Sequence, residues 1–407
     1  MTTADRVTNP APADARSVRR RVAVVVLAEV AAVTAVLLLK RFDGIDLEVY
    51  LGGARALVEH GTPYAAPVPT SYDIALPFLY PPLAALLFVP GTLLPFGVAI
   101  TAFSVASILA VGVVAYLVTA SLLGVLGDRS AVRGHTIAAA VAVGAQLACA
   151  VVEPVRSNLE FGQVNALLMV IVAADLLLPG RARTRGLLVG LAAAVKLVPL
   201  VFVAFFLFRR ELAAAVRAVA AFVVAGAALW LVLPTASRTY WTETLFAAGR
   251  MGHDGEYIGN QSLRGVLART DLAPSWQLLL WALGSAVVLA LVVHTVRKAD
   301  PVVAMLACAI GGLLVSPTSW NHHWVWALPV LVYLGWRWRA ASWWPRALTV
   351  VAAAVYLLGP MWFADDLPGG VLGWPVAESY TLLGVALLGT LAGTPGRACR
   401  STSEVVE

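Results

Sequence analysis

Long apolar runs separated by short polar connections recur along the whole chain. Stretches of about 20 apolar residues have the length that a helix needs to cross a bilayer. The pattern predicts an all-α integral membrane protein with about twelve transmembrane helices. We expect them at residues 22–39, 79–96, 98–123, 136–152, 159–179, 185–208, 212–233, 274–296, 301–316, 321–336, 345–362 and 378–394. An even number of crossings places both termini on one side of the membrane.

Clusters of basic residues indicate which side that is. Residues 16–21 read RSVRRR, directly before the first apolar run, and residues 396–400 read GRACR. Lys and Arg collect in the cytoplasmic loops of membrane proteins. We therefore expect residues 1–20 to be a disordered cytoplasmic N-terminus and residues 397–407 to be a cytoplasmic tail, with one membrane domain over residues 21–396.

Two basic loops disagree with this count. Residues 127–133 and 181–185 fall on the outer side if every apolar run crosses the membrane. The conflict is smaller if 79–96 and 185–208 are re-entrant hairpins, which the prolines inside both segments permit. The later helices are the same in both versions, and the sequence does not choose between them.

Both versions predict external segments at 40–78, 234–273, 316–321 and 363–377. The first two are long, and long loops between tightly connected helices are usually functional. Within the first, residues 46–60 have the pattern of an amphipathic surface helix that ends before Gly61. Its apolar face is expected to hold Leu47, Tyr50, Leu51, Ala54, Leu57 and Val58, opposite Glu48, Arg55 and Glu59.

Composition agrees with a membrane protein and excludes other classes. Of the 407 residues, 60% are hydrophobic and 13% are charged, whereas soluble proteins carry about 25% charged residues. The net charge of +6 does not indicate nucleic-acid binding, because the basic residues lie in clusters between apolar runs. The three cysteines include no CxxC pair, so neither a disulfide framework nor a zinc scaffold is indicated.

Asp46 is the first candidate for chemistry. It lies at or just before the start of the predicted surface helix, where a carboxylate can cap free backbone N–H groups. The same position, at the boundary of membrane and water, also suits a general base. Local sequence does not separate these interpretations.

A second candidate is the segment SPTSWNHHWVWALP, residues 316–329. Tryptophans such as Trp320 are common in interfacial belts, but Asn321, His322 and His323 exceed what a belt requires. Polar groups at membrane depth are costly and tend to face a cavity. Consecutive helical residues point about 100° apart, so at most one histidine faces that cavity directly. No third ligand stands at helical spacing, so we predict no metal site here.

Further polar residues interrupt the apolar pattern. In the segment 257–269, Asn260 and Gln261 can bind sugar hydroxyls and Arg264 can hold a phosphate, although an ordinary solvated loop has the same composition. Gln163 and Asn165 stand at the start of an apolar run.

Lys196 stands inside an apolar run, followed by Pro199. Such a lysine either extends to the membrane surface or meets an anionic head group where the proline opens the helix.

The sequence contains neither a P-loop nor a GxGxxG motif, so no nucleotide cofactor is predicted. Asp365 and Asp366 lack a third ligand for a metal-bound nucleotide. A membrane-embedded enzyme can instead draw its donor and its acceptor from the bilayer. A glycolipid transporter is an alternative, but such proteins usually show internal repeats, and none relates the halves of this chain.

Several motifs occur in a specific order: DLEVYLGGARALVEHGTPY, YPPLAALLFVP, GQVN, a buried lysine before proline, GNQSL and SPTSWNHHWVWALP. Over residues 20–395 this order resembles the actinobacterial polyprenol-phosphate-mannose-dependent mannosyltransferases of glycosyltransferase family 87. Within that family the chain is most similar to the mycobacterial α-1,2-mannosyltransferases that extend phosphatidylinositol tetramannoside to the pentamannoside. Related enzymes that act on lipomannan or lipoarabinomannan, or that transfer arabinose, stay open as alternatives.

The resemblance implies a GT-C fold in the plasma membrane, with the active site on the external face. It also implies a polyprenyl-phosphate mannose donor, a phosphatidylinositol mannoside acceptor and inversion without nucleotide or metal. On this basis Asp46 is the expected base, and His322, then Arg264 and Lys196, are expected at the donor phosphate. Residues expected to bind sugar or acceptor are Tyr50, Asn260, Gln261, Trp320, Asn321, His323, Gln163 and Asn165. The sequence does not indicate an oligomeric state.

Overall fold

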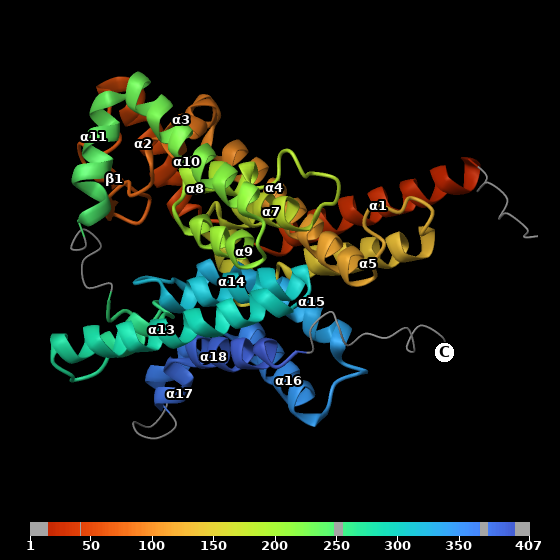
Figure 1. Ribbon diagram of the computed structural model, residues 1–407. Helices are drawn as coiled ribbons and strands as arrows, with labels where there is room; N and C mark the ends of the chain where they lie inside the picture. The colour runs from red at the N-terminus through yellow and green to blue at the C-terminus, as the bar shows by residue number, and fades with distance from the viewer. Residues whose placement is uncertain (1–14, 41, 248–254, 367–372, 395–407) are drawn as a thin grey trace, which may run out of the picture.

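The computed structural model describes residues 15–40, 42–247, 255–366 and 373–394, and it is mostly helical, as predicted. Strands β1 (Val68–Pro69) and β2 (Ala75–Leu76) form one short antiparallel pair, with Val68 opposite Leu76. In Figure 1 the helices up to α11 gather in the upper part of the view, and α13 to α18 gather below them.

The α-helices are α1 (Ala15–Leu39), α2 (Ile45–His60), α3 (Pro82–Phe88), α4 (Phe96–Leu122), α5 (Val132–Ala148), α6 (Glu153–Glu160), α7 (Asn165–Leu177), α8 (Leu187–Val195), α9 (Val203–Phe208), α10 (Leu212–Val232), α11 (Pro234–Thr242), α12 (Leu263–Ala268), α13 (Pro274–Lys298), α14 (Pro301–Val315), α15 (Ala327–Arg337), α16 (Trp343–Leu358), α17 (Gly373–Ala377) and α18 (Ser379–Ala392). Shorter 3-10 helices are η1 (Val89–Leu93), η2 (Val198–Phe202), η3 (Thr244–Phe246), η5 (Asn321–Trp326) and η6 (Pro360–Asp366).

Not every apolar run forms a long helix. Four helices in the described part of the chain, α1, α4, α10 and α13, are long and apolar enough to cross a membrane, and α5 with α6 makes a fifth if this pair, bent by 65°, is one span. Six other apolar helical stretches have only 10–17 residues, or about 15–26 Å at 1.5 Å per residue. The twelve-helix count is therefore not confirmed by length, because breaks interrupt several of the runs.

The segment 79–96 does not form the single long helix that was expected. The segment folds instead as α3 followed by η1 and packs along α2. The ring of Phe88 stacks on that of Tyr50 at 4.6 Å, and Leu51 lies against Gly91. At the far end Phe96 lies against Gly44, which precedes α2. The segment thus packs beside α2, and its prolines prevent one continuous helix.

The segment 185–208 also returns to the end of the bundle where it begins. Arg185 Nε lies 2.6 Å from Glu211 Oε2, and Arg217 donates to the Arg185 carbonyl at 2.8 Å. Between these points α8 stops before Lys196, and η2 and α9 lead back. The segment is therefore not one continuous helix but a helical hairpin, the shape that the re-entrant alternative expected. Gly186 makes the close packing possible, since a Cβ there would lie 2.1 Å from the Ala214 carbonyl oxygen.

Helix α2 follows the predicted pattern with one exception. Its buried residues include Leu47, Tyr50, Leu51, Ala54 and Leu57, but Val58 is 66% exposed. The buried face instead extends to Val49 and Gly53, because α2 packs against α3, η1 and β1. Gly61 ends the helix in the left-handed conformation at φ 73°.

Candidate active site

Helix breaks bring the main polar side chains together. Phe161 to Val164 separate α6 from α7, and α8 ends at Lys196, which has extended backbone at φ −149° and ψ 128°. Lys196 Nζ lies 2.7 Å from Asn165 Oδ1 and 3.4 Å from His323 Nε2. A buried ammonium group therefore lies where α7, α8 and η5 meet.

Helix α2 supplies the opposite side of this cluster. Tyr50 Oη donates to Gln163 Oε1 at 2.7 Å and lies 3.0 Å from Tyr80 Oη. Gln163 Nε2 in turn lies 3.3 Å from Tyr80 Oη. Lys196 Nζ approaches Gln163 Oε1 at 3.5 Å and stands 5.3 Å from the centre of the Tyr80 ring. Gln163 thus links α2 to the lysine.

Asp46 lies in the first turn of α2, beside this network. It does not cap the helix, because Gly44 occupies the N-cap position. Burial raises the pKa of Asp46 to about 6, against the opposing effects of a hydrogen bond from Gln163 and the charge of Lys196. A carboxylate with such a pKa is a stronger base than usual and is still deprotonated at neutral pH.

The two histidines occupy different places. His323 contacts Lys196. His322 is 7% exposed, and its ring packs edge-on against Phe161 at 5.2 Å and His323 at 4.8 Å. Both of its ring nitrogens are buried without a hydrogen-bond partner in the described chain, while its carbonyl accepts from Asn165 Nδ2 at 3.1 Å. The His322 ring thus has unused hydrogen-bonding capacity among the described residues.

An apolar pocket opens beside the lysine. Its polar lining is Asn165, Lys196 and His323, and the remaining lining comes from α7, η2, α14 and the end of η5. The apolar residues are Leu168, Met169, Val172, Val198, Pro199, Val201, Phe202, Ala309, Gly312, Leu313, Val325 and Trp326. This arrangement suits a ligand with an anionic head and an apolar tail.

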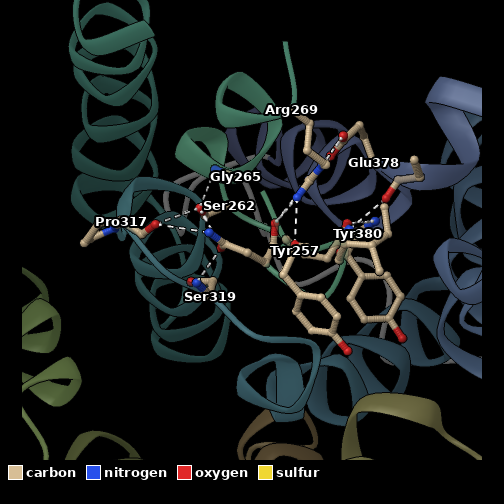
Figure 2. A network of polar contacts seen from close by, with 12 residues as sticks. Tyr257, Ser262, Gly265, Arg269, Pro317, Ser319, Glu378 and Tyr380 are labelled. Carbon is tan, nitrogen blue, oxygen red and sulfur yellow. Dashed lines mark hydrogen bonds and ion pairs between the residues drawn. The ribbon is translucent and has the colours of Figure 1, made fainter. Parts of the chain in front are cut away.

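Asn260 lies in a separate network with Ser262, Pro317 and Ser319, three residues that Figure 2 labels. It is fully buried, and its Oδ1 accepts from the Ser319 N–H at 2.9 Å and from Ser262 Oγ at 3.0 Å. Its Nδ2 donates to the Pro317 carbonyl at 3.3 Å. The amide thus joins the loop before α12 to the loop before η5, and the protein already engages its polar atoms.

Gln261 is engaged in the same way. Its Nε2 donates to the Ala377 carbonyl at 2.7 Å, and its Oε1 accepts from the Tyr380 N–H at 3.1 Å. Nearby, Arg269 pairs with the buried Glu378 (Figure 2). These contacts attach the loop to α17 and α18.

Three other predicted site residues also lie away from the lysine cluster. Trp320 forms an isolated bridge with Asn260, and Asn321 donates to Glu153 Oε1 at 2.8 Å. Arg264 is exposed, 5.6 Å from the Trp281 ring centre. The structure therefore brings together Asp46, Tyr50, Gln163, Asn165, Lys196, His322 and His323 from the predicted set.

Tyr80 and Glu153 are functional candidates that the sequence analysis did not identify. Tyr80 follows an apolar run in the YPP motif, and Glu153 is a carboxylate directly before a proline. Both positions interrupt an apolar pattern, which is the signal that could have found them. Among the described residues, no group of three His, Cys, Asp or Glu side chains is placed to hold a metal ion.

The chain belongs to glycosyltransferase family 87, whose family model matches residues 78–317. It is 38% identical to a polyprenol-phosphate-mannose-dependent α-(1-2)-phosphatidylinositol mannoside mannosyltransferase of Mycolicibacterium smegmatis, over 78% of this chain and 76% of the relative. The Mycobacterium tuberculosis enzyme of that name is 37% identical over 72% and 71% of the two chains. A second Mycolicibacterium smegmatis relative, named for phosphatidylinositol pentamannoside, is 34% identical over 86% and 85%.

Proposed function

We propose that this protein transfers mannose from polyprenyl-phosphate mannose to a mannosylated phosphatidylinositol, with inversion and an α-1,2 linkage. The observation that carries the proposal is the single network in which Asp46 and Lys196 both interact with Gln163. A base and a cation on two sides of one site are what displacement of a lipid phosphate requires.

Asp46 is the base. The acceptor hydroxyl attacks the anomeric carbon on the face opposite the phosphate, and its proton must leave as the new bond forms. The raised pKa of Asp46 favours this role. Tyr50 and Gln163 fix the surroundings of the carboxylate and offer hydrogen bonds to sugar hydroxyls near it.

The leaving group is the phosphate monoester of the lipid, which needs positive charge more than a proton donor. Lys196 supplies this charge, and His322 adds free ring nitrogens on the same side. The apolar pocket next to Lys196 accepts the first part of the polyprenyl chain. Arg264 is left outside this arrangement because it lies on the exposed side of α12.

The site faces the outside of the plasma membrane in this proposal. The basic segments 181–185, 209–217 and 294–298 share one end of the bundle, since Arg217 bonds the Ala182 carbonyl and Arg209 bonds the Val296 and Ala299 carbonyls. Basic clusters favour the cytoplasmic side, and α8 extends from that end toward Lys196. We retain a GT-C arrangement, with segments 79–96 and 185–208 as re-entrant elements and 40–78 as an external segment.

The proposed acceptor is phosphatidylinositol tetramannoside, which becomes the pentamannoside. Phosphatidylinositol pentamannoside is a second candidate, because the relative named for it matches more of this chain than the first two. The names of the relatives thus favour the acceptor class rather than one length.

The test uses purified full-length protein in lipid nanodiscs. Radiolabelled polyprenyl-phosphate mannose is supplied with phosphatidylinositol carrying one to five mannoses, and GDP-mannose replaces the donor in a parallel series. Transfer from the lipid donor alone, with an α-1,2 linkage in the product, would support the proposal. Direct transfer from GDP-mannose, or transfer to none of these acceptors, would reject it.

A further inference from the structure

Glu153 is a buried carboxylate outside the site described above. It is the first residue of α6, and it is 1% exposed. Its Oε1 accepts from Asn321 Nδ2 at 2.8 Å, from Ser157 Oγ at 2.9 Å and from Trp362 Nε1 at 2.9 Å. Its Oε2 accepts from Tyr380 Oη. One carboxylate therefore joins α6, η5, η6 and α18.

Four side chains hydrogen-bond to the carboxyl group of Glu153. All four side chains donate to Glu153, and no ion pair in the described ranges includes it. A buried carboxylate without a cation is costly for folding, so it depends on these donors. An amide could still accept the three bonds at its oxygen and donate to Tyr380 Oη, so removal of the bond from Asn321 needs an apolar residue in place of Glu153.

The bond to Asn321 connects this carboxylate to the candidate active site. Asn321 is the first residue of η5, and its backbone N–H also donates to the Gly259 carbonyl at 2.9 Å. The next carbonyl, that of His322, accepts from Asn165 Nδ2 at 3.1 Å. Asn165 Oδ1 then accepts from Lys196 Nζ at 2.7 Å. Displacement of Asn321 would therefore change the position of the lysine ammonium.

The other donors hold Glu153 from a different side. Tyr380 belongs to α18, where its ring contacts those of Tyr356 and Trp324, and Trp362 belongs to η6. The hydrogen bonds that lead from Glu153 through Asn321 to Lys196 include neither Tyr380 nor Trp362. The hydrogen bond from Asn321 thus connects Glu153 to the site. The bonds from Tyr380 and Trp362 do not, so their removal serves as a matched control.

We propose that Glu153 is a positioning residue for the binding of the lipid phosphate. Its carboxylate holds Asn321 so that the His322 carbonyl and Asn165 keep Lys196 directed at the phosphate of the donor. This inference rests on the proposed function for the identity of the ligand, and it adds a residue that does not itself touch donor or acceptor.

The test is Glu153→Leu in the full-length protein in nanodiscs. The KM for polyprenyl-phosphate mannose should rise about tenfold, while the KM for the acceptor changes by less than about twofold. Asn321→Ala should reproduce this effect, and the double variant should be no worse than either single change, because both remove one connection.

Tyr380→Phe is the control, since it removes one donor to Glu153 and keeps the Asn321 bond. It should lower the unfolding temperature with the donor KM nearly unchanged. If Tyr380→Phe raises the donor KM as much as Glu153→Leu does, the network only stabilises the fold and the positioning role is rejected. If Glu153→Leu does not fold, Asn321→Ala decides: an unchanged donor KM in that variant also rejects the role.

Binding of a fluorescent polyprenyl phosphate, measured without acceptor, separates this inference from the proposed function. If the wild-type protein binds the probe but transfers no mannose, the proposed reaction fails, and weaker binding by Asn321→Ala still supports positioning. If the wild-type protein transfers mannose and both variants bind the probe normally, the reaction stands and the positioning role is overturned.

Discussion

Replacement of Asp46 by asparagine tests the proposed base most directly. The substitution keeps the size of the side chain and its ability to bond Gln163, but it removes the group that takes the proton. Loss of a general base costs about 10² to 10⁴ in turnover, equivalent to about 3–5 kcal/mol in the activation free energy. Because an asparagine at this partly buried position leaves packing unchanged, the unfolding temperature should shift by no more than a few degrees.

The raised pKa of Asp46 gives the same prediction a second measurement. With a pKa of about 6, the wild-type carboxylate is mostly deprotonated at pH 7.5. Protonation inactivates a base, so kcat should be level above pH 7 and fall about tenfold per unit well below pH 6. The residual activity of Asp46→Asn should lack this fall.

The assay follows radiolabelled product in nanodiscs at saturating donor and acceptor, from pH 5 to pH 8. Asp43→Asn is the matched control, because Asp43 is exposed and its carboxylate interacts with Tyr72 rather than with Gln163. It should keep turnover within about twofold of wild type. Near-normal turnover of Asp46→Asn, or a larger loss in Asp43→Asn, would refute the assignment of the base.

Three further predictions concern the cation, the histidines and the topology. Lys196→Met should weaken binding of polyprenyl phosphate at least about tenfold, and unchanged affinity in a titration would place the phosphate elsewhere. His322→Ala should reduce kcat more than His323→Ala, since only His322 has two ring nitrogens without a protein partner among the described residues. Equal, small losses of kcat would mean that both histidines only pack against their neighbours. Cysteines at Arg183 and Arg210 should react with an impermeant thiol reagent only after permeabilisation, because both exposed positions belong to the basic end; labelling of either in intact cells would contradict the proposed orientation.

The sequence determined the helical class and the family. Apolar runs of membrane length predict helices because the backbone must satisfy its own hydrogen bonds in lipid. Ordered motifs indicated the family, and its family model matches residues 78–317. Local patterns also placed the end of α2 at His60, since a left-handed glycine terminates a helix without strain.

Local pattern could not determine which polar residues meet. Asn260 and Gln163 are both buried amides beside apolar segments, yet Asn260 holds two loops together while Gln163 lies between Tyr50 and Lys196. Such a difference depends on partners far away in the chain, which no periodicity records.

The tertiary structure also decided which apolar runs are continuous helices. Hydropathy alone does not distinguish a crossing helix from a hairpin, because both bury the same residues. The Arg185–Glu211 contact shows that 185–208 returns. The same break exposes the end of α8 and places Lys196 opposite Asp46. Proline positions permitted this break, but only the packing of α8 against α10 and the hydrogen bonds to Asn165 and Gln163 stabilise it.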